Sequence, residues 1–199
     1  MTFANALSFS RIPLLFIIIG CLMASGTGYA TVALIAFILA FLSDWLDGFF
    51  ARLFHQATSV GALMDALIDK VFVLGLFTYF LHVGLIPSWG LLPLILMLSR
   101  ELIISGLRQC AMLKQKVIAA EYHGKLKTVL QFMSLFLFIL VAFFQRDLGA
   151  TPQMHAWADF FKFFGRLTFA IAALMTVVSG FYYLHRYRAY LAYNPEDSI

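Results

Sequence analysis

Four aspartates lie inside two strongly apolar stretches of the sequence, where carboxylates are rare. They are Asp44, Asp47, Asp65 and Asp69. A carboxylate at the centre of a membrane helix costs about 2.5–3.5 kcal/mol, so four unpaired ones would cost on the order of 10 kcal/mol. A group that offsets this cost is therefore expected beside them.

The spacing of these aspartates predicts that they face one another. Asp44 and Asp47 are three residues apart, and Asp65 and Asp69 are four apart, so each pair lies on one face of a helix. If the two helices form a hairpin that turns at residues 55–57, Asp47 lies opposite Asp65 and Asp44 lies opposite Asp69. The two opposed pairs are then separated by roughly one helical turn.

An all-oxygen cluster of this kind suits Mg²⁺ or Mn²⁺, and the lack of His and Cys beside it argues against zinc or copper. Two divalent cations held by shared carboxylates are a recurring device for phosphoryl transfer, and one carboxylate can remain as a general base. The alternative is a set of ion pairs with Arg52 and Lys70. Two cations cannot neutralise four anions, which disfavours that alternative.

The composition predicts the membrane helices that must position these residues. Of the 199 residues, 62% are hydrophobic and 12% are charged, which is typical of a membrane protein and leaves no room for a separate soluble domain. We expect one all-α, polytopic domain over residues 1–199 with six transmembrane helices. The apolar stretches run approximately over 12–23, 29–54, 59–84, 88–113, 122–144 and 156–191.

Basic residues predict the orientation in the membrane. Ten of them fall on the side that would hold both termini: Arg11, Arg52, Arg100, Arg108, Lys114, Lys116, Lys125, Lys127, Arg186 and Arg188. The other side carries three: Arg146, Lys162 and Arg166. By the positive-inside rule, both termini and the aspartates are expected at the cytoplasmic face. Ile18-Ile19-Gly20-Cys21 is similar to a lipoprotein cleavage box, but an uncleaved first helix is the preferred interpretation.

The aspartates belong to a longer pattern that resembles the signature of the CDP-alcohol phosphotransferase family at every defined position. The pattern is Asp44-x2-Asp47-Gly48-x2-Ala51-Arg52-x8-Gly61-x3-Asp65-x3-Asp69. The resemblance implies six membrane helices, two divalent cations, a CDP-linked donor and a homodimer. It implies that all four aspartates bind metal and that Asp69 is the catalytic base. It also implies a CDP-binding site formed by Asp44, Gly48, Ala51, Arg52 and Gly61.

Two motifs in the second half look like those of the bacterial phosphatidylglycerophosphate synthase branch of the family. They cover residues 99–108 and 124–131, and a weaker likeness covers Asn5 and residues 10–13, so that the resemblance extends to about residue 145. One departure is Ala66, because many relatives have proline at this position. The departure bears on the subclass more than on the chemistry, since the carboxylate spacing is intact.

Four basic residues of these motifs are candidates for binding an acceptor that carries its own phosphate. They are Arg100, Arg108, Lys125 and Lys127. Arginine can bind two phosphate oxygens at once and lysine acts as a point charge. The alternative is a belt of basic residues that touches lipid headgroups.

The expected reaction is transfer of a phosphatidyl group from CDP-diacylglycerol to sn-glycerol 3-phosphate in a bacterial inner membrane. Rivals within the family are cardiolipin, phosphatidylserine and phosphatidylinositol-phosphate synthases. An ion-coupled transporter is a remote alternative, because intramembrane carboxylates also mark ion pathways. A scaffold without catalytic activity would not need the full pattern.

Overall fold

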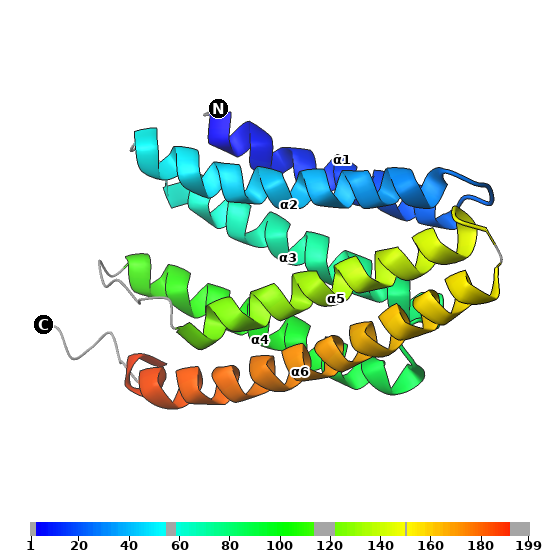
Figure 1. The fold of residues 1–199 in the computed structure, drawn as a ribbon. Coiled ribbons are helices and arrows are strands. Elements are labelled where there is room, and N and C mark those ends of the chain that lie inside the picture. The colour runs from blue at the N-terminus through cyan, green and yellow to red at the C-terminus, as the bar shows by residue number, and fades with distance from the viewer. Residues whose placement is uncertain (1–2, 55–58, 114–121, 150, 192–199) are drawn as a thin grey trace, which may run out of the picture.

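In a computed structural model, the described backbone covers residues 3–54, 59–113, 122–149 and 151–191, and side chains are described for residues 9–43, 64, 66–107, 126–149 and 151–183. Every regular element within these residues is a helix (Figure 1). The elements are α1 (Phe3–Met23), α2 (Tyr29–Phe54), α3 (Ser59–His82), η1 (Ser88–Gly90), α4 (Leu91–Leu113), α5 (Tyr122–Arg146) and α6 (Pro152–Leu191).

The helix bounds follow the apolar stretches closely, and the largest differences lie where polar residues begin a helix. The bounds of α2 agree with the predicted range of 29–54. In contrast, α1 begins at Phe3, well before the apolar stretch that starts at residue 12. Helix α6 begins at Pro152, where Thr151 Oγ1 accepts a hydrogen bond from the backbone N–H of Met154 at 3.3 Å. A threonine cap followed by proline at the first helical position is a favourable helix start.

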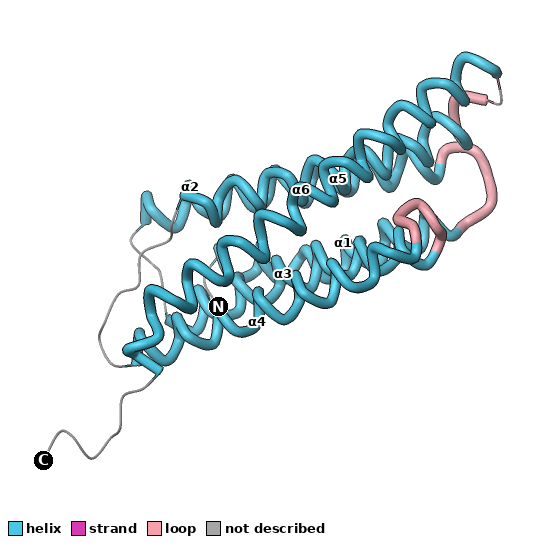
Figure 2. The backbone as a smooth tube through the Cα atoms, turned by 90° about the horizontal axis from the view of Figure 1, so that it is seen from below, coloured by secondary structure: helices cyan, strands magenta, loops and turns pink. Residues whose placement is uncertain are grey.

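The six long helices form an elongated bundle in which neighbours in space differ from neighbours in sequence. Helix α1 packs against both α2 and α3, α5 packs against α2 and α6, and α4 packs against α3 and α6. These contacts arrange the six helices in a closed ring in the order α1, α2, α5, α6, α4 and α3 (Figures 1 and 2). A further contact, between α3 and α5, crosses this ring. The helices that carry the aspartates, α2 and α3, are thus both supported by α1.

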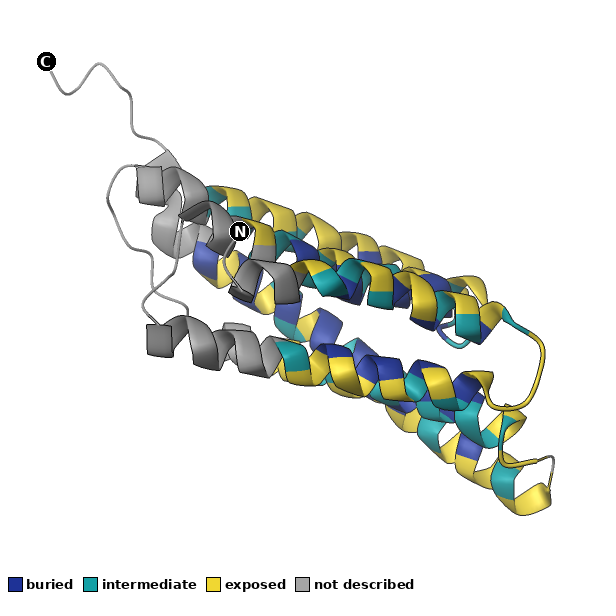
Figure 3. Cartoon of the chain, turned by 90° about the horizontal axis from the view of Figure 1, so that it is seen from above, coloured by how far each residue is buried: buried dark blue, intermediate teal, exposed yellow. Residues whose placement is uncertain are grey.

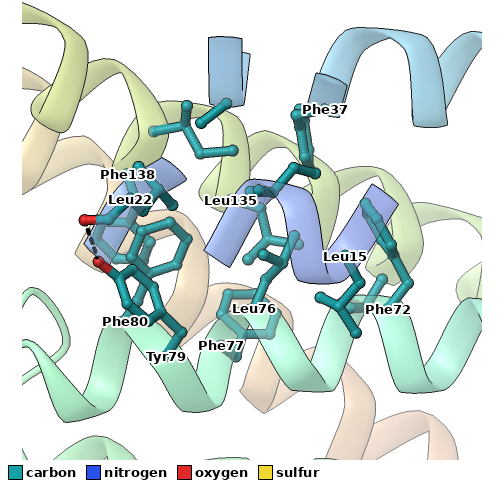
Figure 4. Close-up of a cluster of buried hydrophobic side chains, with 14 of the residues drawn as sticks. Leu15, Leu22, Phe37, Phe72, Leu76, Phe77, Tyr79, Phe80, Leu135 and Phe138 are labelled. Atoms are coloured by element: carbon teal, nitrogen blue, oxygen red, sulfur yellow. Dashed lines mark hydrogen bonds between the residues drawn. The ribbon is translucent and has the colours of Figure 1, made fainter. Parts of the chain in front are cut away.

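Aromatic rings of α3, α5 and α6 fill the centre of the bundle (Figure 4). The ring centroids of Phe80 and Phe138 are 5.2 Å apart, and those of Phe77 and Phe169 are 5.1 Å apart. The Tyr79 hydroxyl donates a hydrogen bond of 2.8 Å to the carbonyl oxygen of Leu22, which ties α3 to the end of α1. Such dense packing fixes the relative depth of the helices, because an interior this tight resists sliding.

Many large apolar side chains are exposed. Along each helix, buried residues alternate with exposed ones (Figure 3). Exposed residues such as Phe16, Leu92, Val129 and Phe181 would be unfavourable in water over so large an area. Among the described residues, three helical segments are long and apolar enough to cross a membrane: Ser88–Leu107, Leu126–Arg146 and Pro152–Tyr183. The all-α membrane architecture is therefore confirmed, and the count of six spans stays a prediction.

Charged side chains hold together the end of the bundle where α1 ends, α2 begins and α5 ends. Arg146 Nη1 donates to the carbonyl oxygen of Leu22 at 2.5 Å, at the end of α1. The Asp147 carboxylate accepts hydrogen bonds from the backbone N–H groups of Gly28 at 2.9 Å and Thr31 at 2.6 Å, at the start of α2. Arg146, the last residue of α5, thus caps the end of α1, and Asp147, the next residue, caps the start of α2.

Candidate active site

The aspartates occupy two antiparallel helices, toward the end of the bundle opposite to the 24–28 turn (Figure 1). Asp44 and Asp47 lie in the second half of α2, and Asp65 and Asp69 lie in the first half of α3. Of these four side chains, only that of Asp69 is among the described ones. The predicted pairing of Asp47 with Asp65 and of Asp44 with Asp69, and the turn at 55–57, lie outside the described residues.

The side chains of the predicted CDP site also lie outside the described ones. Gly48, Ala51 and Arg52 lie in the last two turns of α2, and Gly61 lies in the first turn of α3. Their side-chain environment is outside the described part, so their role stays a prediction.

Asp69 forms an ion pair with Arg11, a residue of α1. The Nη1 atom of Arg11 contacts the Oδ1 atom of Asp69; the arginine side chain is 2% exposed and the aspartate side chain is 38% exposed. A buried guanidinium is very unfavourable without a counter-ion, so this pairing explains why α1 tolerates an arginine in its interior. From the sequence, Arg11 entered the predicted orientation and the weaker family likeness at residues 10–13, but no partner was predicted for it. Its position in an apolar run was the signal that it needs an acidic partner.

Lys70 follows Asp69 in α3 and lies near a second group of charged residues. Its Nζ atom donates to the carbonyl oxygen of Ala66, one turn earlier, at 2.6 Å. Helix α3 also contacts α5, the helix that carries Lys127.

Arg100, Glu101 and Lys127 form this second group, in the interior between α4 and α5. Arg100 Nη1 lies 3.5 Å from Glu101 Oε2, and Lys127 Nζ contacts Glu101 Oε1. The three side chains are only 12%, 12% and 6% exposed. The structure thus brings together two of the four residues predicted to bind an acceptor phosphate. The side chains of the other two, Arg108 and Lys125, lie outside the described ones.

Glu101 and Ser179 belong to this group although the sequence did not single them out. Arg100 Nη2 donates to Ser179 Oγ of α6 at 3.1 Å. Glu101 could have been noticed as an acidic residue next to a basic one in an apolar stretch. No local signal marks Ser179, because only the packing of α6 on α4 brings it to Arg100.

The donor chemistry at the aspartates fits a divalent cation. All four side chains offer carboxylate oxygens, the ligands that Mg²⁺ and Mn²⁺ prefer. Within the part whose side chains are described, no group of three or more potential ligands occurs, because that part includes just one of the four aspartates.

The sequence profile of the CDP-alcohol phosphatidyltransferase family matches residues 1–178. This range includes the ion pair of Arg11 with Asp69 and the group of Arg100, Glu101 and Lys127. The chain belongs to this family. The match extends into α6, well beyond the limit of about residue 145 that the sequence motifs indicated. Members of the CDP-alcohol phosphatidyltransferase family generally depend on divalent cations.

Curated bacterial relatives within this family carry one name, CDP-diacylglycerol--glycerol-3-phosphate 3-phosphatidyltransferase. A relative from Rickettsia typhi is 28% identical over 186 residues, which cover 94% of this chain and 97% of the relative. One from Bacillus subtilis is 31% identical over 152 residues, 76% of this chain and 71% of the relative. One from Pectobacterium atrosepticum is 40% identical over 105 residues, and this match covers 50% of the chain and just 56% of the relative's length. Together with the apolar helices, these bacterial relatives indicate a bacterial membrane protein.

Proposed function

We propose that this CDP-alcohol phosphatidyltransferase transfers the phosphatidyl group of CDP-diacylglycerol to sn-glycerol 3-phosphate, giving phosphatidylglycerophosphate and CMP. The observation that carries the proposal is the name shared by the relatives, one of which aligns with nearly the whole chain. The complete eight-residue pattern from Asp44 to Asp69 supports the chemistry.

In the proposed reaction, Asp69 takes the proton from the primary hydroxyl of glycerol 3-phosphate. The hydroxyl oxygen then forms a bond to the phosphorus of the phosphatidyl group, and the bond from that phosphorus to the oxygen of the CMP phosphate breaks. General-base assistance of this kind contributes about 10²–10⁴-fold to a rate. The contact with Arg11 anchors the Asp69 carboxylate to α1.

Asp44, Asp47, Asp65 and Asp69 would hold two divalent cations, which when bound supply positive charge to the donor pyrophosphate and the departing CMP. Gly48, Ala51, Arg52 and Gly61 would form the site for the CDP moiety. The acyl chains of the donor can stay in the bilayer beside the exposed apolar surface of the bundle.

The choice of acceptor is supported by the buried basic residues of the second half. Arg100 and Lys127 are charged groups held in the interior, and a phosphorylated acceptor offers them the oxygen atoms that both bind well. Serine as an acceptor carries no phosphate group that these two cations could bind. Arg108 and Lys125 would complete the acceptor site at the cytoplasmic side, with both chain termini on the same side.

The deciding experiment is CMP release by the purified protein in mixed micelles with CDP-diacylglycerol and Mg²⁺ or Mn²⁺. Glycerol 3-phosphate, serine, inositol phosphate and phosphatidylglycerol are compared as acceptors. We expect release with glycerol 3-phosphate alone, and none after treatment with a chelator. Release with a different acceptor would contradict the proposed substrate, and full activity after chelation would contradict the metal requirement.

A further inference from the structure

The charged group around Arg100 includes two residues for which the reaction proposed above has no role, Glu101 and Ser179. Glu101 contacts both Arg100 and Lys127, and so joins α4 to α5. Ser179 accepts a hydrogen bond from Arg100 and so joins α4 to α6. Three helices therefore converge on the side chains that are expected to bind the acceptor.

Ser179 is a fixed acceptor for the guanidinium. Its hydroxyl donates to the carbonyl oxygen of Thr176 at 3.0 Å, so its own proton points into the helix and an oxygen lone pair is left for Arg100 Nη2 at 3.1 Å. The serine is 7% exposed, so water has little access to compete for this bond.

The glycine that follows Ser179 gives Arg100 the space to reach it. A Cβ atom at Gly180 would lie 2.8 Å from Arg100 Cγ, closer than nonbonded carbon atoms approach. Ser179 thus binds the guanidinium of Arg100, and the lack of a side chain at Gly180 leaves room for the aliphatic part of the arginine.

Stability alone does not account for this arrangement. Replacing a buried group of ion pairs by apolar side chains of similar size often leaves stability unchanged or increases it. Charged side chains inside a membrane bundle generally mark a functional site. Glu101 holds both Arg100 and Lys127, and Ser179 holds Arg100 from a second direction, so their role is best assigned to fixing the geometry of these cations.

We propose that Glu101 and Ser179 are positioning residues for the acceptor site: they hold the Arg100 guanidinium and the Lys127 ammonium in the arrangement that binds the phosphate of the acceptor. The proposal rests on the function proposed above. It predicts a defect specific to the acceptor, because the donor and the aspartates do not depend on these contacts.

The first test is Ser179→Ala, with Thr78→Ala as the control. Both hydroxyls donate to a backbone carbonyl oxygen of their own helix, at 3.0 Å and 2.8 Å, but Thr78 lies exposed on α3, whereas Ser179 also accepts from Arg100. For Ser179→Ala we expect the KM for glycerol 3-phosphate to rise roughly tenfold, as for loss of a hydrogen bond to a charged group, with the KM for CDP-diacylglycerol unchanged. The control is expected to match the wild type in both constants.

The second test is Glu101→Gln, measured by calorimetric binding of glycerol 3-phosphate without donor as well as by turnover. The amide keeps the size of the side chain but removes the charge that both cations share, so acceptor affinity is expected to fall about tenfold or more. If this variant does not fold, Ser179→Ala, which alters no charge, still tests the proposal.

The outcomes separate the two proposals. A wild type that neither binds glycerol 3-phosphate nor releases CMP with it would overturn both the proposed function and the positioning roles. A wild type that uses glycerol 3-phosphate, together with a Ser179→Ala variant of unchanged acceptor KM, would overturn the positioning role and leave the function in place. A drop in melting temperature without a change in acceptor KM would likewise show that the contact is structural.

Discussion

At the scale of single residues, the buried charges of this protein are explained by their partners. Arg11 is as buried as the phenylalanines of the core, and its contact with Asp69 makes this possible. Asp69 in turn remains 38% exposed, so it can be reached from outside the bundle. A carboxylate that is anchored on one side and accessible on the other is well suited to act on a bound substrate.

Asp69→Asn is expected to lower kcat by about 10²–10⁴-fold, because the amide cannot take a proton from the acceptor hydroxyl. CMP release with glycerol 3-phosphate measures the effect. Asp159→Asn, the same change at an exposed aspartate of α6, is the control and is expected to leave kcat unchanged. An Asp69→Asn enzyme with wild-type turnover would show that another group is the base.

At the scale of the helices, the ends of α1 and α2 are capped by a distant part of the chain. Asp147 follows α5, yet its carboxylate accepts hydrogen bonds from the start of α2. Partial burial raises the pKa of Asp147. The hydrogen bonds from the Thr31 hydroxyl and from the backbone N–H groups of Thr31, Gly28 and Ala30 outweigh that effect, so the net pKa lies below the ordinary value of 3.8.

Asp147→Ala is expected to reduce the free energy of unfolding by about 0.5–2 kcal/mol, the usual value of a helix cap. A lowered pKa in the folded state means that the stabilisation is complete above the ordinary pKa of 3.8 and is lost as the pH falls through the lowered pKa. The difference in melting temperature between wild type and variant should therefore be largest near neutral pH and should shrink below pH 3.8. A difference that does not change with pH would show that the carboxylate charge is not involved.

At the scale of the whole molecule, the antiparallel course of the helices separates two ends with different roles. Residues 24–28, 83–87 and 147–149 lie at one end, between consecutive helices (Figures 1 and 2). The segments that carry the aspartates and the proposed CDP site lie toward the other end. If the bundle spans the membrane, the first end faces outward and the second faces the cytoplasm under the positive-inside rule.

This orientation can be tested with single cysteines in a variant that lacks Cys21 and Cys110. Thr27→Cys and Gln153→Cys lie at exposed positions of the turn end and are expected to react with a membrane-impermeant maleimide in intact cells. A tag at the C-terminus is expected to be accessible to an antibody only after permeabilisation. Labelling in the reverse sense would contradict the predicted sidedness, and with it a cytoplasmic active site.

The sequence alone determined the fold class, the family and nearly all of the helix bounds. Long apolar stretches broken by glycine, proline and polar residues leave little freedom in where a membrane helix can begin and end. The fixed spacing of the eight-residue pattern made the family recognisable, because spacing along a helix is a local property. The sequence did not predict the first turns of α1, because they are too polar to extend the apolar stretch that begins at residue 12.

The tertiary structure decided which charged residues meet. The contact of Arg11 with Asp69 joins residues 58 positions apart in sequence, and that of Arg100 with Ser179 joins residues 79 apart. Neither pair shares a helix, so no periodicity in the sequence could reveal it. These contacts depend on the packing of α1 on α3 and of α6 on α4, which is set by the shapes of many apolar side chains together.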